Sequence, residues 1–114
     1  MASIKLTINE KPLSVNKAWQ GRRFKSKDYT AYEKLLLAIL PRKPKICGRV
    51  SVSILFHLKN DKRTDIDNLC KPLLDIIVKR GYIEDDRLIY RLTLSKKKAE
   101  RDKIELEIEK YESL

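Results

Sequence analysis

The spacing of apolar residues changes twice between residues 50 and 94. Apolar side chains alternate with other residues over 50–56, recur at helical spacing over 69–77, and alternate again over 88–94. A period of two is typical of a half-buried strand, whereas a period near 3.6 is typical of a helix with one buried face. This segment therefore predicts a strand, a helix and a second strand, and the apolar end of the first strand predicts burial on both of its faces.

The limits of the central helix are indicated by its capping residues. Thr64 or Asp67 could cap its start, and Gly81 is placed to end it. Pro72 would cost about 3 kcal/mol in a helix interior. We therefore expect the helix to begin near residues 68–70, so that Pro72 lies in or beside the first turn.

The remaining predicted elements are a strand over 3–9, a long loop over 11–27, a helix over 26–40, a strand over 103–111 and a basic hairpin connection before that last strand. Ser26 or Thr30 could cap the first helix, and Pro41 would end it. The order β-α-β-α-β-β predicts an α+β fold in which two helices pack on one mixed four-stranded sheet. We expect a single domain over residues 1–114.

The charge of the chain points to a polyanionic partner. Its 114 residues include 26 Lys and Arg against 16 Asp and Glu, a formal net charge of +10. Nucleic acid is the first candidate for such a partner. No apolar run has the length of a signal peptide or a membrane span, so we expect a cytoplasmic protein without membrane association. Cys47 and Cys70 lie outside any CxxC and indicate neither a zinc site nor a disulfide framework.

Two aspartates precede the central helix. Asp65 and Asp67 are two residues apart and can direct both carboxylates toward one point. Two such anions repel unless one is protonated or a cation lies between them, and hard carboxylate oxygens suit Mg²⁺ or Mn²⁺. Lys71 follows Asp67 by four residues, so a plain i,i+4 ion pair is the alternative to a catalytic role.

A second acidic group precedes the next predicted strand. The turn "RGYIEDDR" contains Glu84, Asp85 and Asp86. If the following strand pairs beside the strand that ends near Leu58, these acids return to the sheet edge that carries the first two aspartates. One of them would then supply a third carboxylate to the same metal. The alternative is a solvated turn, where Asp is common.

The run "RTDIDNLCKPLLDII", followed by "GYIEDDRLIY", closely resembles the core signature of RusA-type Holliday junction resolvases, small endodeoxyribonucleases often found in prophages. The early "PLSVNKAW" is similar to the N-terminal turn of that family, so the resemblance covers most of the chain. It implies that Asp65, Asp67 and Asp86 bind the metal and that Lys71 acts with them in catalysis.

Two further acids match the pattern of this family. Asp85 is the adjacent alternative to Asp86 as a metal ligand, and Asp75, one turn beyond Lys71, would orient that lysine. The resemblance also implies a homodimer, encoded by a bacterium or a phage, that binds a four-way DNA junction and makes two symmetrically placed nicks. The expected cofactor is Mg²⁺, with Mn²⁺ as a substitute.

These residues suggest a mechanism and a DNA-binding surface. One or two Mg²⁺ ions would polarise the scissile phosphate and lower the pKa of the attacking water, while Lys71 would stabilise transition-state charge or position the water. Trp19, Phe24 or Tyr29 could stack on bases opened at the crossover. The predicted DNA-binding residues are Asn16, Arg22, Arg23, Lys25, Lys27, Lys62 and Arg63. The asparagine comes from the resemblance, and the cations could alternatively be a solvated face.

Two other classes of function are compatible with the same sequence. A metal-dependent nuclease of looser specificity, cutting flaps or RNA, would share the acidic residues and differ in the shape of its substrate. A non-catalytic nucleic-acid-binding module would need only the basic loops, with the aspartates as caps and turn residues. The short lead "NDKRTD" is less arginine-rich than the corresponding segment of the family, which bears on DNA affinity or sequence preference.

Overall fold

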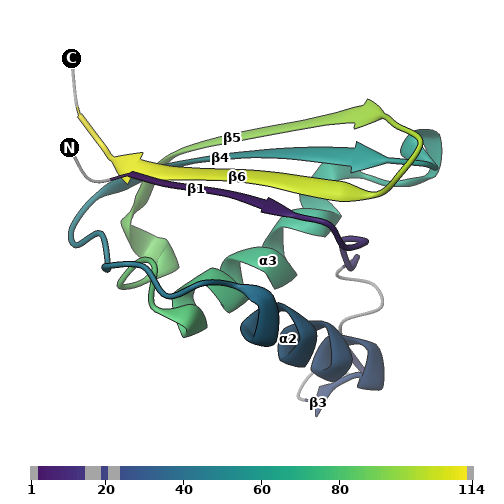
Figure 1. Ribbon diagram of the computed structural model, residues 1–114, viewed down its shortest axis with the longest axis horizontal. Coiled ribbons are helices and arrows are strands. Elements are labelled where there is room, and N and C mark those ends of the chain that lie inside the picture. The colour runs from purple at the N-terminus through teal and green to yellow at the C-terminus, as the bar shows by residue number, and fades with distance from the viewer. Residues whose placement is uncertain (1–2, 15–18, 21–23, 113–114) are drawn as a thin grey trace.

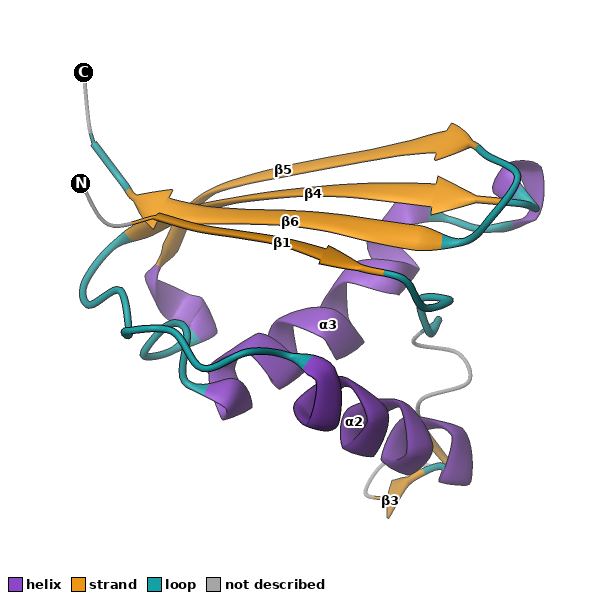
Figure 2. Ribbon diagram, viewed as in Figure 1, coloured by secondary structure: helices purple, strands orange, loops and turns teal. Residues whose placement is uncertain are grey.

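The structure is a computed structural model that describes residues 3–14, 19–20 and 24–112. Four strands form one sheet, and two helices pack against one of its faces (Figures 1 and 2). The sheet strands are β1 (Ser3–Ile8), β4 (Val50–Leu58), β5 (Ile89–Lys98) and β6 (Lys103–Lys110), and the helices are α2 (Lys27–Ile39) and α3 (Ile66–Arg80). The predicted α+β fold and its element order are confirmed.

Shorter elements lie between these. Two 3-10 turns, η1 (Asp61–Arg63) and η2 (Asp86–Leu88), flank α3. The predicted loop before the first helix also contains two short paired strands, β2 (Trp19–Gln20) and β3 (Phe24–Lys25). Two-residue strands are too short to show an apolar period, which is why the sequence predicted only a loop there. No helix in the described part of the chain is long and apolar enough to cross a membrane.

The sheet is mixed, with the order β1-β6-β4-β5. β6 runs antiparallel to both β1 and β4, whereas β5 runs parallel to β4. A parallel pair needs a crossover connection, and α3 provides it. Val50 therefore lies beside Ile89, and Leu58 lies beside Lys98.

This direction overturns one expectation. The sequence suggested that the acids before β5 return to the edge where β4 ends, next to the first pair of aspartates. The pairing of the two strands is as expected, but because they are parallel, Asp86 precedes the end of β5 that lies beside the start of β4. Asp65 follows the opposite end of β4. Asp86 therefore approaches the other acids only through the return path of α3.

The core lies between the sheet and the helices. Alternate residues of the two central strands are buried there, as their period of two predicted. They are Val50, Val52, Ile54 and Phe56 of β4 with Ile104, Leu106 and Ile108 of β6. From α3, Leu69, Leu73, Ile76 and Ile77 pack against them, and each fully buried aliphatic side chain stabilises the fold by about 1.5–3 kcal/mol. Phe56, His57 and Leu58 are all buried, so the predicted two-sided burial at the end of β4 is confirmed.

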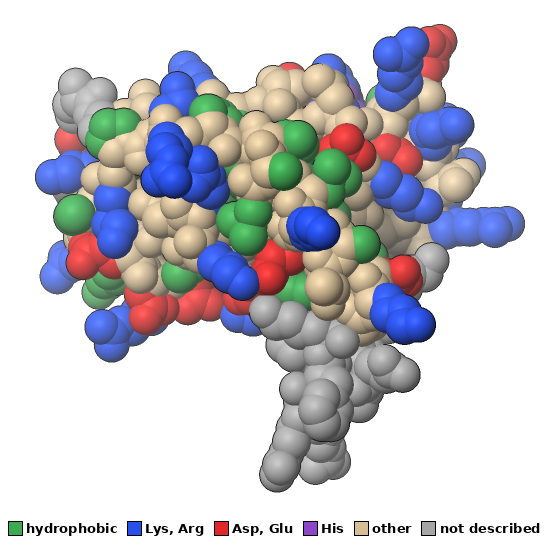
Figure 3. Space-filling view, turned by 60° about the horizontal axis from the view of Figure 1, so that its bottom comes forward, with side chains coloured by type: hydrophobic (Ala, Val, Ile, Leu, Met, Phe, Trp, Pro, Cys, Tyr) green, Lys and Arg blue, Asp and Glu red, His purple; other side chains and the backbone are tan. Residues whose placement is uncertain are grey.

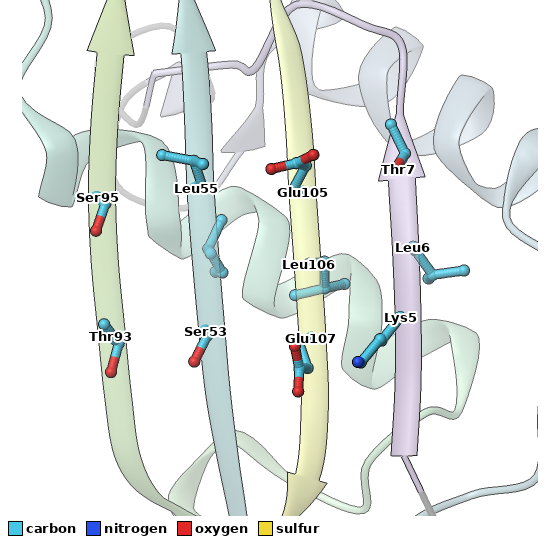
Figure 4. Close-up of a pocket in the computed structure, with 11 residues that line it drawn as sticks. Lys5, Leu6, Thr7, Ser53, Leu55, Thr93, Ser95, Glu105, Leu106 and Glu107 are labelled. Atoms are coloured by element: carbon cyan, nitrogen blue, oxygen red, sulfur yellow. The ribbon is translucent and has the colours of Figure 1, made fainter.

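No helix of the described chain covers the other face of the sheet. Short polar side chains such as Ser53 and Thr93, together with charged ones such as Glu105, line a trough of about 430 Å³ on this face (Figure 4). β5 is an edge strand, and its Tyr90 and Leu92 are 54% and 42% exposed. Their alternation predicted a half-buried strand, but the helices cover the centre of the sheet and leave most of this edge uncovered.

The helix boundaries show where local rules apply and where packing overrides them. Ser26 caps α2, because its Oγ accepts a hydrogen bond of 3.1 Å from the backbone N–H of Tyr29. Gly81 ends α3 in the left-handed conformation, as predicted. The start of α3 was predicted wrongly: it begins at Ile66 with Asp65 as its N-cap, so Pro72 lies inside the helix. The buried face of α3 begins within its first turn, and this packing outweighs the lost backbone hydrogen bond.

Candidate active site at the start of the second helix

Asp65 and Asp67 lie at the N-terminus of α3. Asp65 is the N-cap by position, but its side chain accepts no capping hydrogen bond. Asp67 follows in the first turn, and both side chains are exposed. Neither carboxylate has a hydrogen bond or an ion pair within the described residues. The partial positive charge of the helix N-terminus favours both anions. Because neither carboxylate has a partner among the described residues, their oxygens are open to a cation.

Lys71 joins α3 to the turn before β5. Its Nζ lies 3.0 Å from Oδ1 of Asp75 and 3.0 Å from Oδ2 of Asp86. The i,i+4 ion pair with Asp67 that the spacing allowed is not formed, because the ammonium is directed to these two other carboxylates. Lys71 therefore brings Asp86, fifteen residues along the chain, to the side of α3 that also carries Asp75.

Hydrogen bonds within this cluster shift the pKa values of Lys71 and Asp86. The hydrogen bond to Asp86, followed by that to Asp75, raises the pKa of Lys71 above its usual value. The hydrogen bond from Lys71 is the main cause of a lowered pKa for Asp86. Both shifts favour the charged forms of Lys71 and Asp86 at neutral pH.

The two adjacent acids of the turn have different surroundings. Oδ1 of Asp85 accepts a hydrogen bond of 3.1 Å from the backbone N–H of Arg87 and so caps η2. Its Oδ2 lies 3.6 Å from Nε of Arg87. Asp86 instead directs its carboxylate to Lys71. Asp85 is therefore engaged within its own turn, and Asp86 is the one of these two acids that contacts Lys71.

The fit of these residues to a metal ion is partial. Across residues 3–14, 19–20 and 24–112, no group of three or more His, Cys, Asp or Glu side chains is arranged to hold one ion. The donor chemistry nevertheless suits Mg²⁺, which commonly takes one or two carboxylates and completes its coordination with phosphate and water. Asp65 and Asp67, two exposed carboxylates without partners among the described residues, fit an ion shared with a substrate.

A hollow opens beside the start of α3. It has a volume of about 640 Å³, and Asp65, Asn68 and Arg63 line it together with residues of the segment that follows β1. Of the four predicted catalytic residues, only Asp65 lines this hollow. The trough on the uncovered sheet face contains none of them. The hollow at Asp65 is therefore the concave surface next to the predicted chemistry.

The predicted DNA-binding residues are only partly described. Lys62 and Arg63 are exposed in η1, directly before Asp65, and Lys27 is exposed at the start of α2. Lys25 is described only as part of β3, while Asn16, Arg22 and Arg23 lie outside the described residues. Lys and Arg side chains are spread over the face seen in Figure 3, with acidic ones between them.

The aromatic residues predicted to stack on bases have no described surface position. Tyr29 is 1% exposed, so it belongs to the interior and the expectation that it contacts bases is wrong. Burial is the main cause that raises its pKa to about 12, and the negative charge of Asp75 is the next. The side chains of Trp19 and Phe24 lie outside the description. The exposed ring of Tyr90 has Arg49 stacked over it at 4.9 Å and the Tyr111 ring at 5.5 Å.

Sequence reasoning missed Lys96 as a functional candidate. Nζ of Lys96, near the end of β5, donates hydrogen bonds to the backbone carbonyls of Asp61 and Thr64, at 2.6 and 2.8 Å. These carbonyls belong to the turn that leads into Asp65. The only signal in the sequence was a row of lysines, which predicted a basic hairpin connection and could not show that one of them binds the backbone.

The chain is similar to known endodeoxyribonucleases. A family model described as Endodeoxyribonuclease RusA matches residues 9–109. The chain is 42% identical over 48 residues to Crossover junction endodeoxyribonuclease RusA of Aquifex aeolicus (strain VF5), a match that spans 42% of this chain and 38% of that protein. It is 28% identical over 118 residues to Crossover junction endodeoxyribonuclease rusA of Lactococcus phage r1t, a match that spans 91% of this chain and 90% of that protein.

Proposed function

Because the chain belongs to the RusA family of endodeoxyribonucleases, we propose that it resolves four-way DNA junctions by Mg²⁺-dependent, paired and symmetric nicks. The observation that carries the chemistry is the contact of 3.0 Å between Lys71 and Asp86, one helical turn from the unpaired carboxylate of Asp67. Paired nicks need two active sites, so the acting species is a homodimer. Junction DNA is also the substrate named for both similar proteins.

Asp65, Asp67 and Asp86 are the residues that would hold Mg²⁺, or Mn²⁺ in its place. When bound, the ion supplies a Lewis acid for the scissile phosphate and an activated water. Lys71 pairs with the Asp86 carboxylate, so its ammonium would compete with the ion for that ligand. Within the described part of the chain, Asp65 and Asp67 have no such competitor.

Lys71 acts as a cation in this proposal. Its raised pKa keeps it protonated at neutral pH, and a protonated amine has no lone pair with which to accept a proton. As a cation it would stabilise the negative charge that develops on the phosphate oxygens or position the attacking water. Asp75 holds the ammonium from one turn further along α3.

The basic residues near this cluster would bind the DNA backbone. Lys62 and Arg63 are exposed immediately before Asp65, so phosphates that contact them lie close to the carboxylates. Asn16, Arg22, Arg23, Lys25 and Lys27 are the proposed second group of DNA contacts. These contacts carry affinity and do not depend on the metal.

The first test separates binding from cutting. With Mg²⁺, we expect nicks at symmetric positions in a four-way junction and far slower cutting of duplex, flap and RNA substrates. With EDTA, the protein should still retard the junction on a gel but leave it uncut, because the loops bind many phosphates while the carboxylates act on one. Equal cutting of flaps or RNA would identify a nuclease of looser specificity, and undiminished cutting in EDTA would refute the metal.

A second test concerns the cations beside Asp65. Replacing Lys62 and Arg63 by Ala should weaken junction binding and reduce the slope of log K against log salt by up to about 2 units. The physical reason is the loss of counterion release at two phosphates. Replacement of Lys43 and Lys45, exposed in the segment after α2, removes the same charge and should change the slope less. Equal changes in both double variants would mean that net charge alone matters.

A further inference from the structure

We propose that Lys96 is a positioning residue that fixes the turn before Asp65 and thereby presents this carboxylate to Mg²⁺. The proposal rests on the proposed function, since it concerns the same site. Lys96 lies fifteen or more positions along the chain from every predicted DNA-binding or catalytic residue except Asp85 and Asp86.

The register of the sheet explains why this lysine reaches the turn. Lys96 lies beside Phe56 of β4, and Phe56 is fully buried on the helix side of the sheet. Neighbouring residues on adjacent strands share a face, so the Lys96 side chain lies on the helix side as well. Lys97 lies beside His57 and occupies the opposite face. Alternation along β5 therefore directs one lysine of the row to the turn and its neighbour away from it.

Two carbonyl groups converge on the Lys96 ammonium. The hydrogen bond of 2.6 Å to Asp61 holds the first residue of η1, and the bond of 2.8 Å to Thr64 holds the residue directly before Asp65. Hydrogen bonds from an ammonium are charge-assisted and stronger than those between neutral groups. The backbone is thus held at both ends of the turn, and the position of Asp65 follows from it because its own side chain makes no capping bond.

The hairpin between β5 and β6 holds the same segment at a second place. The backbone N–H of Lys59 donates a hydrogen bond of 2.9 Å to Oδ1 of Asp102, and Nζ of Lys98 donates to the Lys59 carbonyl. The backbone N–H of Ala99 bonds to the carbonyl of Leu58 at 3.0 Å. These contacts fix the start of the segment after β4. Among the described residues of the hairpin, Lys96 is the one that reaches the residue adjoining Asp65.

A contact with DNA phosphate explains this geometry less well. An ammonium has three N–H donors, and the two carbonyls occupy two of them. A lysine that binds phosphate would more simply direct its ammonium to solvent, as exposure allows for Lys62 in the same turn. The two explanations make different predictions for the dependence of cutting on metal and on salt.

The test compares Lys96→Met with the matched control Lys97→Met on the other face of the sheet. Met keeps the apolar stem but has no donor. We expect Lys96→Met to raise the Mg²⁺ concentration for half-maximal nicking by about 10-fold or more, since partners that orient metal ligands typically contribute that much. At saturating Mg²⁺ the nicking rate should largely recover, and the junction Kd and its salt slope should match wild type. Lys96→Arg should restore part of the metal affinity, and Lys97→Met should resemble wild type.

Binding of Mn²⁺ to the protein without DNA gives a readout that is independent of cutting. Titration followed by the electron paramagnetic resonance of free Mn²⁺ should show weaker binding to Lys96→Met than to wild type. The proposal is overturned by an unchanged metal dependence, by a loss of rate at every Mg²⁺ concentration together with a lower Tm, or by a flattened salt slope. If wild type binds Mn²⁺ but cuts no DNA, the proposed function fails while the Mn²⁺ comparison still decides the role of Lys96. A wild-type protein that binds no Mn²⁺ overturns both.

Discussion

Asp67→Asn is expected to lower the nicking rate on a four-way junction by more than about a hundredfold, because loss of a metal ligand costs more than loss of a group that only orients one. The fold should survive. Asp67 has no hydrogen bond or ion pair in the described structure, so the change removes only a favourable helix-terminus interaction of about 0.3–1 kcal/mol. Junction binding should be retained or tightened, since one negative charge near the phosphate is lost. The measurements are nicking rate, gel shift and Tm.

Matched variants give this prediction its meaning. Asp65→Asn and Asp86→Asn should behave in the same way, whereas Asp85→Asn should cut better than Asp86→Asn because Asn can also cap η2. Glu100→Gln removes an exposed acid from the hairpin after β5 and should cut normally. A near wild-type rate for Asp67→Asn would reduce the first pair of aspartates to a favourable helix start, and the mechanism proposed for this chain would be wrong.

Lys71→Ala should also abolish nicking, but its effect on metal binding should have the opposite sign. Removing the ammonium takes away a competitor for Asp86 and a positive charge that repels the ion, so Mn²⁺ should bind at least as tightly as to wild type. The cost in stability should be small. Lys71 and Asp86 are 53% and 40% exposed, and exposed ion pairs contribute about 0–1 kcal/mol.

This sign distinguishes the lysine from the aspartates. If Lys71 supplied only structural support, nicking and metal binding would both remain close to wild type. If it were needed to assemble the metal site, Mn²⁺ binding would weaken along with nicking. Lys79→Ala is the control on the same helix, because the exposed Lys79 also pairs with a carboxylate, that of Glu33 at 2.8 Å, and has no contact with the acidic cluster. It should nick junctions at the wild-type rate.

The different expected effects of Asp67→Asn and Lys71→Ala on metal binding also concern the state of the site before DNA binds. In the described structure, Asp86 is neutralised by Lys71, while Asp65 and Asp67 face solvent. A protein in this state would carry an incomplete metal site, which the scissile phosphate helps to complete. Cutting would then depend on bound substrate, because the Asp86 carboxylate would have to leave the Lys71 ammonium before it could bind the metal ion.

Local sequence determined the elements of this protein and the residue types of its site. A period of two located β1, β4 and β6, and a period near 3.6 located α3, because burial of one face imposes these periods wherever a segment lies in the fold. Capping at Ser26 and the stop at Gly81 are likewise interactions within a few residues. The close spacing of the acidic residues indicated a metal site, because carboxylate oxygens suit Mg²⁺ wherever they lie in a fold, and the resemblance to the RusA family implied phosphodiester chemistry.

Only the tertiary structure decided which of these groups meet. The parallel pairing of β5 with β4 separates Asp86 from the edge that carries Asp65, and the return path of α3 brings it to Lys71 instead of to the first pair of aspartates. The choice of Lys96, and not Lys97, to hold the turn before Asp65 depends on the register between two strands. Strand direction and register are set by contacts between residues tens of positions apart, and no local period records them. The packing that buries one face of α3 also outweighs the cost of Pro72 inside the helix, whereas local propensity alone predicted a later start.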